Sequence, residues 1–399
     1  MIKIEYEDIK FEELTTIVKA RFLKYYHFDI NKEELERIGK YTIKNGTIEV
    51  DASEKTVTNK FNRILHTGLA NLKTENDKDV IYIHQETGIP LIGTNEFGIV
   101  DRNTSLIEVK PHSSCNLNCV YCSVDAGKIS RKTNEFVIEE GYLVSEFKKV
   151  AQIKKHPIEA SINPQGEPLM YSRITELVKD LKAVKGVKIV SMNSNGLLLT
   201  KELIDELSTA GLDRINISMN TANKVTATKL AGGAYDTPKL KEMINYAQTK
   251  FEILIAPLII PGYNDSEIGT LIEFCKQLTK MPRFGFQNFL EYKKGRNPTK
   301  SKSMEWFMEL LKENEKKYDV RLINTKEDFD IQEDEKIPKP YKKGKAINAK
   351  VIMPGKYNTE WLCVSEDRCI TVNGYLKIGD EVRLRIVRDK HNIYKATVI

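Results

Sequence analysis

The chain has 399 residues, of which 41% are hydrophobic and 30% charged, a composition typical of a folded protein with two or three domains. We expect a cytoplasmic protein, because no apolar run is long enough to cross a bilayer and the charged, mixed segment 1–8 does not resemble a signal peptide. The net charge is +6, but residues 336–399 alone carry 14 Lys and Arg against 6 Asp and Glu. This basic excess near the C-terminus indicates a segment that binds a polyanion.

Residues 1–100 predict a small α/β accessory domain. We expect helices at 12–24 and 32–38, followed by a strand at 80–84. The segment contains no cysteine and no internal repeat, so its pattern predicts no function.

The first cysteines of the chain form a tight group directly after a predicted strand at 106–110. Cys115, Cys119 and Cys122 are spaced Cys-x3-Cys-x2-Cys, with Tyr121 directly before the last. Three thiolates in one loop can bind three irons of a 4Fe–4S cluster and leave the fourth iron open for another ligand. The alternative is a structural zinc site, because His112 would complete a Cys₃His ligand set.

This cysteine pattern resembles the cluster loop of the radical S-adenosylmethionine (SAM) superfamily. In that family the open iron chelates the amino and carboxylate groups of SAM. One electron from the cluster then cleaves SAM to methionine and a 5′-deoxyadenosyl radical, which abstracts a hydrogen atom from the substrate. The resemblance implies a 4Fe–4S cluster and SAM as cofactors, a ferredoxin- or flavodoxin-type electron donor as partner, and Cys115, Cys119 and Cys122 as the metal ligands and catalytic centre.

Residues 101–325 predict alternating strands and helices. A cap at Thr200 with Gly211 at the far end, and Thr237-Pro238 at the start of a later helix, delimit two of the helices. Alternation of this kind predicts parallel strands joined by right-handed crossovers. Six units are too few for a closed (β/α)₈ barrel and suit the partial (β/α)₆ barrel typical of the radical SAM family. The predicted strands are 106–110, 158–163, 187–192, 214–219, 252–260 and 283–290.

Polar residues and glycines follow these strands in phase with the cysteines. Active sites of such barrels lie at the C-terminal ends of the strands. A zinc site accounts for the cysteines but not for this series, so the series favours the radical SAM interpretation. The segments are 163–168, 193–196, 216–220, 261–265 and 287–288.

Two strand-end segments resemble elements of the family that contact SAM or the substrate, the first of them by holding the SAM amino group. Gly166 and Glu167, followed by Pro168, are similar to the Gly-Gly-Glu-Pro element, although Gln165 replaces its first glycine. A carboxylate suits this role because it accepts hydrogen bonds from an amino group. The next segment, Ser194-Asn195-Gly196, is similar to the family's Thr-Asn-Gly and implies polar contacts to SAM or substrate from Ser194 and Asn195.

The later strand ends imply contacts to the rest of SAM. Ser218 and Asn220 resemble the polar pair that binds the SAM carboxylate and ribose hydroxyls, with Asn220 standing where an acid is common. Gly262 resembles the glycine of the turn beside adenine, and Tyr121 is expected to pack against adenine or the cluster.

Residues 326–343 turn from acidic to basic and proline-broken, which predicts a linker. Short strands with Gly and Asn turns follow at 344–399 and predict a small β-barrel. This segment resembles a TRAM domain, a barrel found at the end of RNA-modifying enzymes. The resemblance implies phosphate contacts from Lys342, Lys343, Lys345, Lys350, Arg383, Arg385 and Arg388, with Tyr341, Tyr357 or Trp361 available to stack on a base.

Together these features predict a radical SAM enzyme that modifies an RNA, with tRNA the expected class, at an unactivated carbon. Modification of a protein, a peptide or a small metabolite, with the C-terminal barrel as a docking module, is the alternative. A non-catalytic iron–sulfur or zinc protein that binds RNA is the third possibility. The tRNA methylthiotransferases carry a second cluster on N-terminal cysteines, and the absence of cysteine before Cys115 disfavours that chemistry. Cys275, Cys363 and Cys369 are expected in the core, although a disulfide between the last two is also open.

Overall fold

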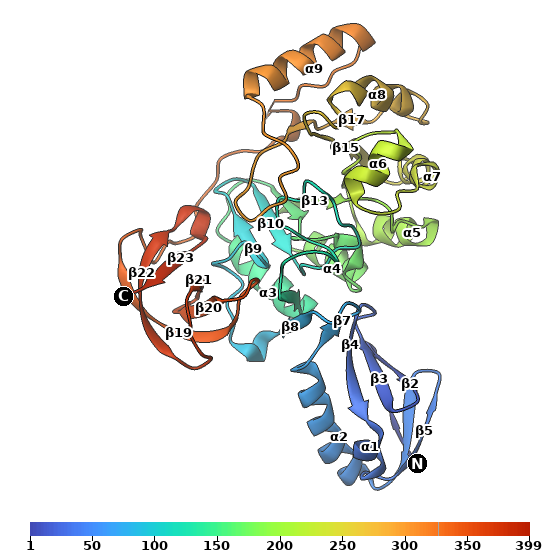
Figure 1. Cartoon of the computed structure of the whole chain (residues 1–399), viewed down its shortest axis with the longest axis vertical. Helices are drawn as coiled ribbons and strands as arrows, with labels where there is room; N and C mark the ends of the chain where they lie inside the picture. Colours follow the sequence, from blue (N-terminus) through green and yellow to red (C-terminus); the bar gives the residue numbers. More distant parts are fainter. Residues whose placement is uncertain (326) are drawn as a thin grey trace.

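The computed structural model describes residues 1–325 and 327–399. Figure 1 shows N-terminal sheets at one end of the molecule, a central sheet flanked by helices, and a C-terminal barrel beside the central sheet. Within the described residues, every helix is too short or too polar to cross a bilayer.

The N-terminal part contains a three-stranded sheet, β1-β6-β5, and five strands of a second sheet, β8-β7-β4-β3-β2. The helix predicted at 12–24 is wrong: an antiparallel hairpin of β2 and β3 lies there, and β3 alternates half-buried and buried side chains with a period of two. The helix predicted at 32–38 and the strand at 80–84 are confirmed as α1 and β8. The elements are β1 (Ile2–Ile4), β2 (Ile9–Glu13), β3 (Ile17–Phe22), β4 (Tyr26–Asn31), α1 (Lys32–Glu36), β5 (Lys40–Lys44), β6 (Thr47–Asp51), α2 (Glu54–Leu69), β7 (Lys73–Thr74), β8 (Asp79–Ile83) and η1 (Gln85–Thr87).

The central sheet confirms the partial barrel. Its order is β17-β15-β14-β13-β12-β10-β9, and all neighbours are parallel except β9, which runs antiparallel to β10. Two short parallel strands, β16 and β18, continue the paths of β15 and β17. The strands are β9 (Gly98–Asp101), β10 (Leu106–Lys110), β12 (Ile158–Ile162), β13 (Val187–Ser194), β14 (Arg214–Ile217), β15 (Glu252–Ile255), β16 (Leu258–Ile259), β17 (Arg283–Phe284) and β18 (Gln287–Asn288).

Boundaries were predicted for two of the helices, and both lie within one residue of the prediction. The Thr200 hydroxyl accepts a hydrogen bond from the Leu203 N–H, and Gly211 closes the same helix in the left-handed region. The helix predicted to begin with Thr237 as its cap is capped one residue earlier, by Asp236. The helices are α3 (Glu140–Ala151), η2 (Pro168–Met170), α4 (Ile174–Lys182), α5 (Lys201–Ala210), α6 (Lys224–Ala231), α7 (Thr237–Ala247), η3 (Asp265–Glu267), α8 (Ile268–Lys276), α9 (Met304–Tyr318) and η4 (Glu327–Phe329).

The chain between β10 and the next strand, β11 (Asn134–Ile138), carries the cysteines. We call residues 111–133 the cysteine loop. Strand β11 does not join the central sheet but pairs in parallel with β8 of the N-terminal part, and all five of its residues are buried. The cysteine loop is therefore held between two different sheets.

The C-terminal segment forms a closed barrel in the order β19-β20-β21-β23-β22. Cys363 and Cys369 are free and buried in it, and Cys275 is free and buried in α8. Of the predicted linker, Lys326 lies outside the described residues, whereas Ile337 and Tyr341 are buried. The barrel elements are β19 (Ala346–Pro354), β20 (Glu360–Ser365), β21 (Arg368–Asn373), β22 (Glu381–Arg388), η5 (Lys390–Asn392) and β23 (Lys395–Val398).

Backbone hydrogen bonds fasten this barrel to the segment just before the central sheet. The Cys369 N–H donates to the Ile92 carbonyl over 2.9 Å, and the Tyr394 N–H donates to the Gly93 carbonyl over 2.7 Å. A Cβ on Gly93 would lie 2.1 Å from the Cys369 carbonyl oxygen, so the close approach requires glycine.

Candidate active site

A cavity of about 250 Å³ lies where the C-terminal ends of β12, β13 and β14 meet the cysteine loop. We call it the cofactor cavity. Gly262 does not line it; the Gly262 N–H donates instead to Asp265 within its own turn. The cavity brings together ten of the residues predicted from the sequence: Cys115, Cys119, Tyr121, Cys122, Gly166, Glu167, Ser194, Asn195, Ser218 and Asn220.

The end of α6 supports the first half of the cysteine loop. The backbone N–H groups of Asn118 and Val120 donate to the carbonyls of Ala231 and Leu230, each over 3.0 Å. Gly232 follows with φ +62°, and a Cβ there would lie 2.3 Å from the Asn118 carbonyl oxygen. The loop therefore rests on the C-terminal turn of a helix that itself follows strand β14.

Arg296 supports the second half of the loop and had no signal in the sequence, because no motif surrounds it. Its side chain donates to the Cys119 carbonyl over 2.9 Å and to the Asp125 carboxylate over 2.8 Å. Its backbone N–H donates to the Cys122 carbonyl over 2.9 Å. One residue from beyond β18 thus fixes the backbone at two of the three cysteines.

Glu167 lines the cofactor cavity and is held by three hydrogen bonds. Its carboxylate accepts hydrogen bonds from the Ser194 hydroxyl (2.6 Å), the Asn195 N–H (2.8 Å) and the Leu169 N–H (3.1 Å). Only one of these donors reaches Oε2, so that oxygen can accept a further hydrogen bond. Burial raises the pKa of Glu167 to about 7, against the opposing effect of the three donors. The carboxyl is thus placed to receive a donor from a ligand.

Glu167 is expected to make the stability of the ligand-free protein depend on pH. Its pKa in the folded protein is raised above the value of about 4.3 in an unfolded chain. Its contribution to the free energy of unfolding is therefore most favourable at low pH and is lost as the pH rises through 7. The loss is about 3 kcal/mol by linkage. In thermal melts, the melting temperature of the wild type should fall by a few degrees relative to that of Glu167→Gln between pH 5 and pH 8. Parallel curves for the two proteins would contradict the assignment.

Asn220 lies in the cofactor cavity but its amide already has partners within the protein. Its nitrogen donates to the Tyr121 hydroxyl, and its oxygen accepts from the Leu258 N–H over 2.9 Å. Asn220 therefore positions Tyr121. Tyr235, which the sequence did not single out because it follows a helix and not a strand, also lines the cavity; its buried hydroxyl has no partner among the described residues.

His112 does not join the cysteines, so the structure does not assemble the Cys₃His zinc set. Its Nε2 pairs with the Glu167 carbonyl over 2.9 Å, and its ring lies 5.8 Å from that of Tyr171. Burial lowers the pKa of His112 to about 3. Over residues 1–325 and 327–399, no three His, Cys, Asp or Glu side chains are arranged around a single metal ion. Cluster ligands are different, because each thiolate binds its own iron atom.

A second cavity of about 430 Å³ lies inside the partial barrel, and we call it the barrel chamber. It shares Asn163 and Asn193 with the cofactor cavity. Glu159 and Arg214 form a buried ion pair on its wall, and Oε2 of Glu159 has no partner among the described residues. The Asn216 amide donates to Asn193 over 2.6 Å. A chamber with both polar and apolar side chains on its wall therefore adjoins the cysteine site.

The family model of the radical SAM superfamily matches residues 109–275. This range includes the three cysteines of the cysteine loop and most of the central sheet. An uncharacterised protein of Methanocaldococcus jannaschii is 34% identical over 98% of this chain and 97% of its own length. The chain belongs to the radical SAM superfamily. GTP 3′,8-cyclase of Aquifex aeolicus is 28% identical, over 46% of this chain and 57% of the cyclase. The structure of Streptococcus suis SuiB bound to S-adenosylmethionine is 15% identical with a TM-score of 0.43, covering 79% of this chain and 71% of SuiB.

As a radical SAM enzyme, the protein uses a 4Fe–4S cluster and SAM. The cofactor cavity fits both, because three thiols line it and Glu167 offers a free acceptor. The cluster, when bound, supplies the electron that cleaves SAM. We expect Cys115, Cys119 and Cys122 to hold three irons, Glu167 to hold the SAM amino group, and the exposed hydroxyl of Ser218 to reach other polar groups of SAM.

Proposed function

We propose that this radical SAM enzyme modifies an RNA, tRNA being the expected class, at an unactivated carbon, and that its C-terminal barrel is a TRAM-like domain that grips the RNA. The observation that carries the proposal is a row of basic side chains on the outer face of that barrel. The closed five-stranded order of the barrel supports it as well. We expect the electron to come from a ferredoxin- or flavodoxin-type donor.

The basic row follows from the pairing of β22 with β19. Along β22, Arg383 and Arg385 are exposed, while Leu384 and Ile386 are buried. The turn before β19 joins the same edge, because the Gly344 N–H donates to the Ile386 carbonyl over 2.8 Å. Six basic residues of this region are exposed, and none of the six has an ion pair within the described part of the chain. We call them the basic stripe: Lys342, Lys343, Lys345, Lys350, Arg383 and Arg385.

The aromatic residues of the barrel differ from the prediction in which rings are free to stack. Tyr341 is not available to stack on a base, because it is buried with its ring edge-on to Tyr394 and its hydroxyl on Ser365. The Trp361 indole N–H is engaged with the Gly374 carbonyl over 3.0 Å. Tyr375, between β21 and β22, is 98% exposed and offers a ring for stacking.

Reversing two charges of the stripe is expected to weaken RNA binding. Arg383→Glu/Arg385→Glu should lower tRNA affinity about tenfold or more and flatten its dependence on salt, because each lost phosphate contact removes released counterions. The matched control is Lys312→Glu/Lys316→Glu, on the exposed side of α9. Equal losses in both variants would indicate only a net-charge effect.

Nucleoside mass spectrometry of RNA from cells with and without the gene then tests the function: a nucleoside that disappears supports it, and unchanged RNA contradicts it.

The second candidate function is modification of a small metabolite or a peptide. The barrel chamber favours it, because its size suits a small molecule and the polar side chains of Asn163, Asn193 and Asn216 line it. Under this proposal RNA nucleosides stay unchanged and the protein shows no salt-dependent affinity for RNA, while SAM cleavage to 5′-deoxyadenosine persists.

A further inference from the structure

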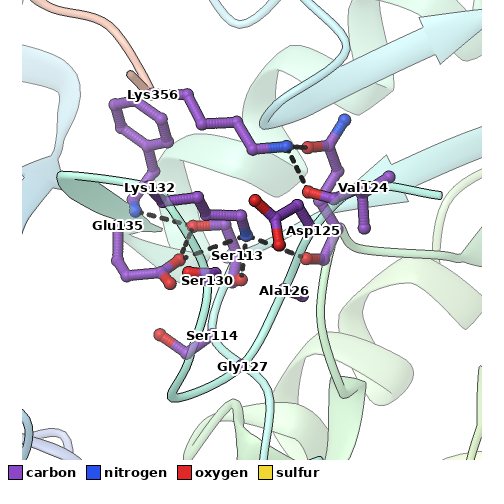
Figure 2. Close-up of polar contacts among 12 residues, drawn as sticks. Ser113, Ser114, Val124, Asp125, Ala126, Gly127, Ser130, Lys132, Glu135 and Lys356 are labelled. Atoms are coloured by element: carbon purple, nitrogen blue, oxygen red, sulfur yellow. Dashed lines mark hydrogen bonds and ion pairs between the residues drawn. The ribbon is translucent and has the colours of Figure 1, made fainter. Parts of the chain in front are cut away.

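The turn between β19 and β20 leaves the C-terminal barrel and enters the wall of the active site. Lys356, in this turn, is 4% exposed. Its ammonium donates to the Val124 carbonyl over 2.7 Å and to the Gln165 side-chain oxygen over 2.6 Å (Figure 2 shows the contact with Val124). Val124 comes two residues after Cys122, and Gln165 directly precedes Gly166. One lysine thus joins the cysteine loop to the loop that presents Glu167.

Gln165 is oriented to receive this lysine. Its nitrogen donates to the Asn95 carbonyl over 2.9 Å, which turns its oxygen toward Lys356. Related enzymes are expected to have glycine at this position, and glycine has no side chain to accept the bond. The departure from the family's pattern therefore has a partner in this chain, 191 positions later.

The backbone around Lys356 is fixed, so the side chain is not a mobile surface lysine. The Thr133 N–H donates to the Lys356 carbonyl over 3.0 Å, and the Asn134 amide donates to the Gly355 carbonyl over 2.7 Å. Both partners lie at the end of the cysteine loop, beside and within β11. The barrel turn is thereby held against the loop independently of the ammonium.

A second buried lysine reinforces the same junction. Its ammonium, on Lys132, donates to the Ser113 carbonyl over 3.1 Å and to the Gln165 carbonyl over 3.4 Å. The same nitrogen lies 3.6 Å from a Glu135 carboxylate oxygen (Figure 2 labels Lys132, Ser113 and Glu135). Glu135 thus balances Lys132, whereas Lys356 has two uncharged acceptors and no ion pair within 1–325 and 327–399. Burial, and then Lys132, lower the pKa of Lys356 to about 8, so it is mostly protonated at pH 7. Lys356 consequently places a positive charge behind the cysteine loop, opposed in part by the carboxylates of Glu96 and Glu135.

We propose that Lys356 and Gln165 form a clasp by which the C-terminal barrel positions the two cofactor-binding loops and places a positive charge beside the cluster. Lys356 is a positioning residue in this scheme, and the barrel is a part of the active site whatever the substrate is. A nearby buried cation stabilises the more negative, reduced cluster. The clasp therefore raises the reduction potential of the cluster and keeps the two loops in the relative position that SAM binding requires.

Two variants of the full-length, anaerobically reconstituted protein separate charge from position. Lys356→Met should shift the midpoint potential of the cluster, measured by EPR-monitored titration, to a more negative value and weaken SAM binding at least fivefold. Gln165→Gly keeps the charge but loses the contact, so SAM affinity should fall while the potential moves less. Lys356→Arg should restore the potential more fully than the affinity. The double variant Lys356→Met/Gln165→Gly should bind SAM no more weakly than Lys356→Met, because both changes remove one shared contact.

The matched control is Lys294→Met. Lys294 also joins this barrel turn, through Glu360, but its side chain is 46% exposed and does not touch either loop. It should leave both the potential and SAM affinity unchanged. Lys356→Met with a wild-type potential and affinity would overturn the proposal. If that variant fails to assemble a cluster, Gln165→Gly decides: unchanged SAM affinity overturns the clasp, and a fivefold loss supports it.

Discussion

Replacing Cys119 by alanine is expected to abolish both cluster assembly and SAM cleavage. Each thiolate of the loop would bind a different iron, so a loop with two cysteines leaves two irons without a protein ligand. Cys119 also lies in the best-supported part of the loop, because Arg296 donates to its carbonyl. After anaerobic reconstitution, iron should fall from about four atoms per chain to near zero, and 5′-deoxyadenosine production should fall by about 10³-fold or more.

The matched control for this variant is Cys275→Ala. Cys275 is equally a free cysteine but is buried in α8 and does not line the cofactor cavity. It should keep the cluster absorbance and activity, at a modest cost in stability from the lost sulfur packing. A Cys119→Ala protein that binds four irons and cleaves SAM would show that the cysteine loop is not the cluster site.

Gly166→Ala is expected to disrupt SAM binding by a steric effect alone. An added Cβ would lie 1.9 Å from the Ser114 carbonyl oxygen, a distance that no packed pair of atoms tolerates. The same carbonyl accepts the Glu167 N–H over 2.9 Å, so moving it also moves Glu167. We expect SAM affinity, measured by equilibrium binding to the reconstituted protein, to fall more than tenfold. Stability should fall by about 1–3 kcal/mol, as in other overpacked sites.

Gly141→Ala is the control for the effect of a methyl group on a glycine. No heavy atom lies within 4 Å of the position its Cβ would take, and Gly141 is inside α3. Alanine there should stabilise the protein by about 0.5–1 kcal/mol and leave SAM binding intact. If both variants bound SAM like wild type, the close approach of the two loops would have no role in the site.

Local patterns were sufficient to predict six of the seven strands of the central sheet and most of the cofactor cavity, but they missed the antiparallel edge strand β9. In the strands 106–110 and 158–162, apolar residues largely alternate with Glu, Lys or Ser. The place of the polar residues at the ends of these strands follows from strand direction alone. The same reasoning wrongly predicted a helix at 12–24, because this mixed charged and apolar segment is compatible with both the helical and the strand periodicity. In the folded protein its residues form a strand that pairs with β2 and β4.

Residues that reach the site from distant segments could not be predicted. Arg296, Tyr235 and Lys356 come from a loop, a helix end and another barrel, and none of them belongs to a local motif. Gln165 was visible in the sequence only as a loss of glycine, since its partner lies 191 positions away. His112, in contrast, was close to the cysteines in sequence but turns to the Glu167 carbonyl in space.

The contacts of Lys356 also bear on when the active site is completed during synthesis. Val124 and Lys356 are separated by 232 positions, so the ribosome makes the cysteine loop long before it makes the turn that packs against it. At about 5–20 residues per second, this interval is on the order of 10–50 s. Throughout that time the nascent chain has its cysteines but not the wall behind them. The wall behind the cysteines is therefore completed only after Lys356 has been synthesised.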